Sequence, residues 1–170
     1  RQLASHTSGL PSVPQPLIAL PRDDADPYRR LDRQAIYQYL RTAEGLRPPG
    51  RIAYSNYGIG LLGHVLESKA DASLESLMAA RIFGPLSMSS TFMTPIEGPG
   101  RALTPGASEK GDAAAIWRFG ALGGAGALCS SVNDMLAFAR ADLAPKGPLK
   151  AALAAERDER GPVDAIIGWM

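Results

Sequence analysis

Proline and glycine divide this chain into short segments that can be helical and longer segments that cannot. Five prolines fall within residues 1–27, and the run Pro48-Pro49-Gly50 interrupts the chain again. Proline fixes its own φ and restricts the residue before it, so no regular helix continues through such a stretch. We therefore expect residues 1–27 to form an irregular or extended arm, with helices confined to the intervals between breaks.

Helical spacing of apolar residues then predicts where the long helices lie. The predicted intervals are residues 32–43, 56–70, 73–83 and 131–143. In the second interval Leu61, Leu62, Val65 and Leu66 form the apolar side, and the last interval has an equivalent side that includes Met135, Leu136 and Leu143.

Cap signals support these starts. Asp32, Ser73 and Ser131 stand where an N-cap is expected, and Asp134 lies three residues after Ser131, as in a capping box. Asn56 begins the second interval and could cap that helix in the same way.

The remaining stretches predict little regular structure. Residues 87–126 are rich in Gly, Pro, Ser and Thr and predict loops with at most short strands. Residues 120–131 are small and nearly uncharged, so this stretch can pass close to other backbone or to a ligand. A short helix at 149–156 and a buried strand at 163–170 complete a segment that is mainly α, a helical subdomain with long loops and a terminal strand.

Composition excludes several classes of protein. The chain has 170 residues, of which 45% are hydrophobic and 21% charged, and its formal net charge is +1. These values predict one globular domain with no basic stripe for nucleic acid, and no apolar run is long enough to be transmembrane. Cys129 is the single cysteine, so it forms no internal disulfide and says nothing about compartment. The chain opens at Arg1 and closes on an apolar run, and we expect it to be a piece of a longer protein.

Several kinds of catalytic or binding site find no support. His6 and His64 have no further ligands at metal-binding spacing, so we expect neither a metal nor another cofactor. No G-x-S-x-G elbow accompanies His6, and phosphate-binding glycine loops are absent. Ser131 and Asn133 match an S-x-N pattern, but capping already accounts for Ser131.

The stretch Tyr54-Ser55-Asn56 is open to two interpretations. Asn56 can simply cap the helix that it begins. Alternatively, Tyr54 at the start of a helix can present its phenol to a cleft and exchange protons during acyl transfer. The amide of Asn56 would then donate to a substrate carbonyl.

Four ordered blocks give this stretch a context: "LASHTSGLP", "PPGRIAYSNYGIGLLGHVLE", "IFGPLSMSSTFM" and "GALGGAGALCSSVNDMLAFA". Together they resemble the serine β-lactamase-like superfamily, closest to class C β-lactamases, penicillin-binding DD-peptidases and esterases of that fold. The resemblance implies that Tyr54 handles protons and that Asn56 contacts the substrate amide and a catalytic lysine. Two positions depart from the family pattern, because Asp71 and Ser87 stand where glycine is common.

The resemblance also implies what lies outside this segment. The family's nucleophilic serine sits in an S-x-x-K motif before the "HTSG" block, and none of the 170 residues forms that motif. The K-T-G or H-T-G strand should follow after Met170. Residues 1–170 would thus be the central, largely helical part of an α+β, β-lactamase/transpeptidase-like domain.

The implied function is that of a serine hydrolase acting on amide, ester or lactam carbonyls through an acyl-enzyme. Its substrate would be a small molecule or a peptidoglycan peptide, in the periplasm or outside the cell, and this segment alone would be inactive. Truncation would leave an apolar face through which copies could associate. Two alternatives remain, a non-catalytic binding module of the same fold and a helical scaffold, and the flanking sequences would distinguish them.

Overall fold

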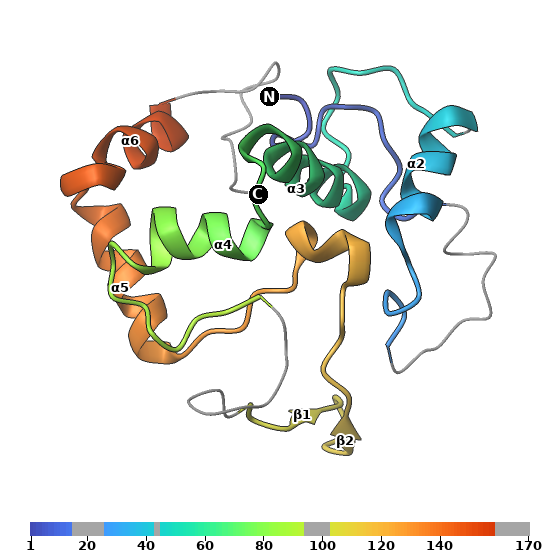
Figure 1. Ribbon diagram of the computed structural model, residues 1–170. Coiled ribbons are helices and arrows are strands. Elements are labelled where there is room, and N and C mark those ends of the chain that lie inside the picture. The colour runs from blue at the N-terminus through green and yellow to red at the C-terminus, as the bar shows by residue number, and fades with distance from the viewer. Residues whose placement is uncertain (15–25, 43–44, 94–102, 159–170) are drawn as a thin grey trace.

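The computed structural model describes the chain outside residues 15–25, 43–44, 94–102 and 159–170 (Figure 1). The elements follow in the order α2 (Arg33–Thr42), α3 (Asn56–Ala70), α4 (Leu74–Met78), the π-helical turn η1 (Ala79–Phe83), β1 (Gly106–Ala107), β2 (Ala113–Ala114), the 3-10 helix η2 (Gly120–Ala125), α5 (Val132–Leu143), the 3-10 turn η3 (Gly147–Leu149) and α6 (Lys150–Asp158). The mainly helical class is confirmed, and β1 and β2 form only a short antiparallel hairpin. The strand expected at 163–170 lies outside the described residues.

The predicted helix starts are confirmed by their caps. Asp32, Ser73 and Ser131 each accept a hydrogen bond from the backbone N–H three residues later, at 2.8, 3.2 and 3.2 Å. Each bond satisfies one of the donors that the first helical turn leaves without a partner inside the helix. These local signals explain why the sequence predicted the bounds of the helices closely.

Helix α3 occupies the centre of the molecule, and η2 packs directly against it (Figure 1). The contact depends on glycine, because a Cβ at Gly60 would lie 2.5 Å from Cδ2 and 3.0 Å from Cα of Leu122. On the facing side, a Cβ at Gly124 would lie 2.9 Å from the carbonyl oxygen of Ile59. The expected close approach of the glycine-rich stretch to other backbone is therefore confirmed.

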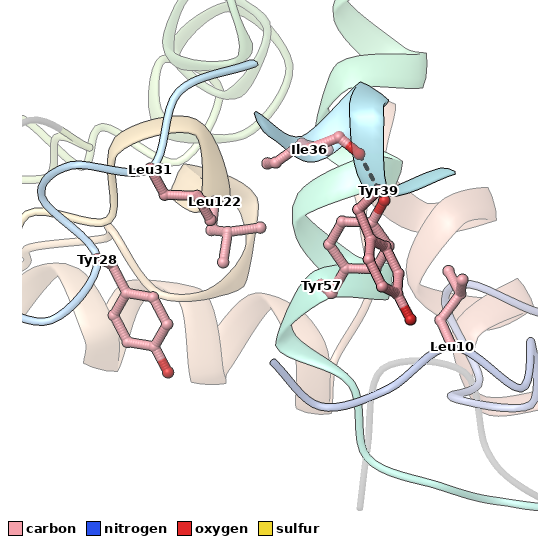
Figure 2. Packing of buried hydrophobic residues seen from close by; sticks show 7 residues of the cluster. All are labelled: Leu10, Tyr28, Leu31, Ile36, Tyr39, Tyr57 and Leu122. Atoms are coloured by element: carbon pink, nitrogen blue, oxygen red, sulfur yellow. Dashed lines mark hydrogen bonds between the residues drawn. The ribbon is translucent and has the colours of Figure 1, made fainter. Parts of the chain in front are cut away.

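The core joins five parts of the chain around the start of α3 (Figure 2). Its buried members are Leu10, Tyr28, Leu31, Ile36, Tyr39, Tyr57 and Leu122. Tyr57 is fully buried, donates its hydroxyl to the Ile36 carbonyl at 2.8 Å and meets Tyr39 edge-on. Burial, with Tyr39 beside it, holds the pKa of Tyr57 well above its ordinary value. This core fixes the N-terminal arm and α2 against the first turn of α3.

The contacts of Asp134 differ from the predicted capping box. The capping box would turn this carboxylate back toward Ser131, but it is buried and accepts from Ser90 N–H at 2.8 Å and Thr91 Oγ1 at 2.7 Å. Only the serine half of the box is present. The reason is that the donors of Ser90 and Thr91 face this buried carboxylate. Leaving buried donors and an acceptor unpaired would cost stability.

The apolar sides of α3 and α5 are covered only in part: Leu61 of α3 packs against the core, but other members of both sides are exposed. Val65 and Leu66 of α3 are 50% and 46% exposed, and Leu143 of α5 is 78% exposed. The buried residues of α3 are Tyr57, Gly58, Gly60, Gly63 and His64. Helical spacing thus predicted the helices correctly, but it did not predict that much of each apolar side stays exposed. None of the described helices combines the length and apolar character needed to cross a membrane.

Candidate active site

Ser55, and not Asn56, is the N-cap of α3. Its hydroxyl accepts from Gly58 N–H at 2.8 Å and donates to the Pro11 carbonyl at 2.7 Å. Ser55 has extended backbone dihedrals and is 1% exposed, whereas Asn56 is already the first helical residue. The capping interpretation of Asn56 is therefore wrong, and its side chain is available for another role. Serine is about as good an N-cap as asparagine, so Ser55 was itself a cap signal in the sequence.

Tyr54 stands at the surface just before this cap. Its side chain is 53% exposed, and its ring stacks on that of His6, with centroids 4.7 Å apart and an interplanar angle of 25°. His6 has a positive φ of 53° and accepts a hydrogen bond at Nδ1 from Ser55 N–H, at 3.0 Å. Burial lowers the pKa of His6, which agrees with a neutral ring that has an acceptor at Nδ1.

The arm carrying His6 is fixed to the segment before α3 by its backbone. Ala53 N–H donates to the His6 carbonyl and Gly50 N–H donates to the Thr7 carbonyl, both at 2.8 Å. The triad role that sequence analysis had found unsupported for His6 gains no support, because Nδ1 is occupied by a backbone donor. The stack on His6 therefore holds one face of the Tyr54 ring, while about half of the side chain stays exposed to solvent.

Asn56 is half-buried on the other side of Ser55. Its Nδ2 donates to the hydroxyl of Tyr28 at 3.2 Å. Tyr28 is buried and stacks on Phe119 with centroids 5.0 Å apart, while Trp117 meets it edge-on at 5.8 Å. No sequence pattern indicated that Tyr28 or His6 would contact this stretch.

These contacts define what the stretch can do chemically. A half-exposed phenol can pass a proton to or from a reacting group, and an amide can accept from an ammonium or donate to a carbonyl. Neither group is committed to capping. Both are placed by residues of the N-terminal arm and of the segment before α2, which meet at the start of α3.

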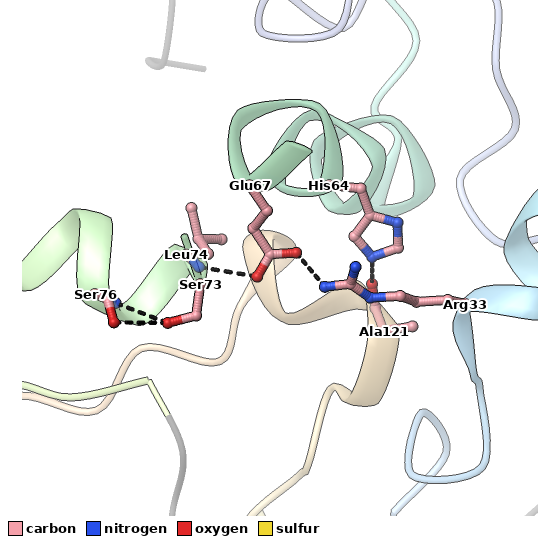
Figure 3. Close-up of polar contacts among 7 residues, drawn as sticks. All are labelled: Arg33, His64, Glu67, Ser73, Leu74, Ser76 and Ala121. Atoms are coloured by element: carbon pink, nitrogen blue, oxygen red, sulfur yellow. Dashed lines mark hydrogen bonds and ion pairs between the residues drawn. The ribbon is translucent and has the colours of Figure 1, made fainter. Parts of the chain in front are cut away.

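A cavity of about 500 Å³ lies elsewhere, between α3, η2 and α4. Its polar groups are mostly satisfied by one another (Figure 3). His64 Nε2 bonds the Ala121 carbonyl at 2.7 Å, Arg33 pairs with Glu67, and Glu67 also accepts from Leu74 N–H at 2.8 Å. His64 thus has a packing role, and we assign this network to holding α2, α3, η2 and α4 together.

Within the described parts of the chain, no three His, Cys, Asp or Glu side chains gather as a metal site would require. Tyr54 and Asn56 are the candidate site, on the contacts described above.

Comparison with known proteins connects this arrangement with a family. Residues 1–165 match the family model described as Beta-lactamase. A D-aminopeptidase of Cereibacter sphaeroides is 32% identical over 95 residues, which are 55% of this chain and 18% of that protein.

Solved structures share the fold. A β-lactamase/D-alanine carboxypeptidase from Yersinia pestis, complexed with citrate, is 26% identical with a TM-score of 0.70 and covers 97% of this chain and 46% of its own. A β-lactamase/D-alanine carboxypeptidase from Pseudomonas syringae is 22% identical with a TM-score of 0.70, over 92% of this chain and 42% of its own. A class C β-lactamase from Rhodobacter sphaeroides is 24% identical with a TM-score of 0.71, over 94% and 43%.

The chain spans less than half the length of each of these proteins. What matches is a helical part of a larger α+β fold, as the order of the four sequence blocks predicted. Since the family model extends over residues 1–165, this chain belongs to the beta-lactamase family.

Proposed function

We propose that these residues are the central part of a serine hydrolase that opens amide, ester or lactam carbonyls through an acyl-enzyme. Tyr54 relays protons between the nucleophile and the leaving group, and Asn56 holds the substrate amide and a catalytic lysine. The nucleophilic serine and its lysine are supplied by residues outside this segment.

One observation carries the proposal. Ser55 caps α3 and thereby frees Asn56, while Tyr54 is half-exposed beside it. Ser55 alone is enough to cap the helix, so capping does not explain the phenol of Tyr54 or the amide of Asn56. Both side chains are instead held by rings of other segments, His6 and Tyr28.

The decisive experiment is Tyr54→Phe in the complete protein that contains these residues. Phenylalanine keeps the ring that stacks on His6 and removes only the hydroxyl. We expect kcat to fall on the order of 10²-fold or more with an unchanged melting temperature. Tyr37→Phe, at an exposed tyrosine of α2, is the matched control and should leave kcat as it is. A well-folded Tyr54→Phe enzyme with normal kcat would refute the proposal.

Asn56 and Ser55 form a second matched pair. Asn56→Ala should lower kcat/KM with little change in melting, because its side chain caps nothing. Ser55→Ala removes the cap and should cost about 0.5–2 kcal/mol of stability. A melting loss in Asn56→Ala equal to that of Ser55→Ala, with normal turnover, would show that Asn56 acts only structurally, through its bond to Tyr28.

The isolated 170-residue chain should neither hydrolyse nitrocefin nor form a covalent penicillin adduct, because none of its serines lies in an S-x-x-K motif. Mass spectrometry after incubation with penicillin tests this. A stoichiometric penicilloyl increment on a serine of this chain would contradict the assignment of the nucleophile to another segment.

The substrate class is narrowed by assay of the complete protein. The names of its relatives, a D-aminopeptidase and β-lactamase/D-alanine carboxypeptidases, favour D-alanyl peptides and lactams over simple esters. Parallel measurements with a D-Ala-D-Ala peptide, nitrocefin and p-nitrophenyl butyrate rank the three. Tight binding without turnover on all of them would identify a non-catalytic binding module of the same fold.

The outward side of α5 supports a proposal about association. Its exposed apolar residues recur at helical spacing and form a stripe; they are Val132, Met135, Leu136 and Leu143. Copies of the isolated chain should associate through this stripe, since burying it removes apolar surface from water. Sedimentation should show concentration-dependent dimers that Leu136→Glu disrupts. A monomer at all concentrations would refute this proposal without affecting the catalytic one.

A further inference from the structure

We propose that Tyr28 is a positioning residue that sets the orientation of the Asn56 amide at the candidate site. The inference rests on the proposed function, because orientation matters only if Asn56 meets a substrate or a lysine. Tyr28 would touch neither reacting group, and would act through the hydrogen bond from Asn56 Nδ2 to its hydroxyl, at 3.2 Å.

Tyr28 is suited to this task because its ring has little freedom. It is 9% exposed and lies nearly parallel to Phe119, at an interplanar angle of 11°. Its carbonyl accepts from Leu31 N–H at 3.1 Å, so the backbone is held in a turn. A Cβ added at Gly120 would lie 3.0 Å from that same carbonyl oxygen, which shows how closely the first residue of η2 approaches it.

A second clamp fixes the segment just before Tyr28. The Asp26 carboxylate is 6% exposed and accepts from Arg118 N–H at 2.8 Å and from Arg118 Nε at 3.0 Å. The two segments that carry Tyr28 and Phe119 are thereby joined next to the ring stack. The hydroxyl of Tyr28 is therefore presented from a rigid support, although it lies outside any helix or strand.

The consequence for Asn56 concerns which end of its amide is free. The terminal torsion of an asparagine has a broad profile, so an unheld amide exposes its oxygen or its nitrogen in turn. With Nδ2 bound to Tyr28, Oδ1 is turned to the other side, where no described residue donates to it. One Nδ2 proton and both lone pairs of Oδ1 remain, which suits a site that must accept from an ammonium and donate to a carbonyl.

The test is a double-mutant cycle in the complete enzyme, with nitrocefin as the probe and p-nitrophenyl butyrate where that ester is turned over faster. Tyr28→Phe keeps the ring stack and removes the hydroxyl. We expect kcat/KM to fall on the order of 3- to 10-fold where Asn56 is present, and less than about 2-fold in the Asn56→Ala background. Tyr57→Phe, which removes a buried hydroxyl bonded to backbone, is the control and should act equally in both backgrounds.

A direct measurement accompanies the kinetics. In the NMR spectrum of the complete protein, one side-chain amide proton of Asn56 should exchange slowly with solvent, and Tyr28→Phe should abolish this protection. Equal effects of Tyr28→Phe in both backgrounds, with Asn56→Ala itself impaired, would overturn the inference and leave the proposed function intact. Normal turnover in Tyr54→Phe and Asn56→Ala would overturn both.

Discussion

Helices α3 and α5 start in the same way and are used differently. Each has a serine N-cap whose hydroxyl accepts from the amide three residues later, Ser55 in α3 and Ser131 in α5. Yet α3 buries one whole side against η2 and the core, whereas Asp134 is the only buried residue of α5. Equal cap signals thus produce a central helix in one case and a peripheral helix in the other.

Besides the core residue Tyr57, the small residues of α3 distinguish it from α5 and account for its central position. The buried side of α3 has Gly58, Gly60 and Gly63, and these let the backbone of η2 approach it closely. Helix α5 has no glycine, and its one buried residue, Asp134, bonds the distant segment Ser90-Thr91. The candidate site lies at the start of the tightly packed helix.

We expect Gly60→Ala to change the free energy of unfolding more than any other substitution that compares α3 with α5. In an ordinary helix this change stabilises by about 1 kcal/mol. Here the new methyl would collide with Leu122, so we expect unfolding free energy to fall by about 2–3 kcal/mol in urea titrations. Ser68→Ala, on the exposed side of the same helix, should raise stability slightly. Stabilisation by Gly60→Ala would show that close packing of η2 on α3 does not depend on this glycine.

The attachment of α5 should be weaker and electrostatic. Asp134→Ala removes the acceptor of two hydrogen bonds and should cost about 1–2 kcal/mol, while exposing the Ser90 amide to hydrogen exchange. Val132→Ala, in the same turn of α5 and 77% exposed, should change stability by less than about 0.5 kcal/mol. If Val132→Ala cost as much as Asp134→Ala, α5 would be packed in the way α3 is.

Dependence on pH should separate the two helices as well. Burial lowers the pKa of His64 in α3, and of His6 in the arm that bonds the Ser55 cap, below the ordinary value of 6.5. The unfolded chain therefore binds protons before the folded chain does, and stability should fall as the pH drops below about 6.5 and hold above it. Urea midpoints between about pH 5 and pH 7.5 measure this, and His64→Gln should flatten the curve. An unchanged slope in that variant would assign the dependence to other groups.

The smallest effect is expected at the end of α3. Asp71 has φ of 51° and ψ of 42°, the left-handed conformation that glycine adopts most easily, and glycine is common there in the family that the sequence resembles. Asp71→Gly should raise the melting temperature by an amount equivalent to about 0.5–1 kcal/mol. Asp71→Ala is the counterpart and should lower it. Destabilisation by glycine would show that the aspartate side chain has a role of its own.

The sequence predicted the helices well because their bounds depend on local signals. Asp32, Ser73 and Ser131 cap the helices that they were expected to cap, and the breaks at proline and glycine end them. The buried side of α3 was predicted poorly, because three of its five buried residues are glycines and give no hydrophobic signal. The contact between Gly60 and Leu122 depends on two segments whose approach no local pattern reveals.

The candidate site was predicted in part. Tyr54 and Asn56 were identified by resemblance, and the choice between capping and another role required the position of Ser55. The supporting contacts could not be predicted, because His6 and Tyr28 lie 49 and 28 residues before the groups that they bond. Such pairs form only when the arm and the segment before α2 are already folded onto α3.

The double use of the Ser55 hydroxyl has a consequence for the order of events in folding. Its bond to Gly58 closes within one turn and can form while α3 is still alone, but its bond to Pro11 joins residues 44 apart in sequence. Closing so long a loop costs entropy that must be offset by later contacts. Helix α3 should therefore nucleate early and the surroundings of Tyr54 should settle last, so that a Leu10→Ala change accelerates unfolding while leaving the folding rate nearly constant.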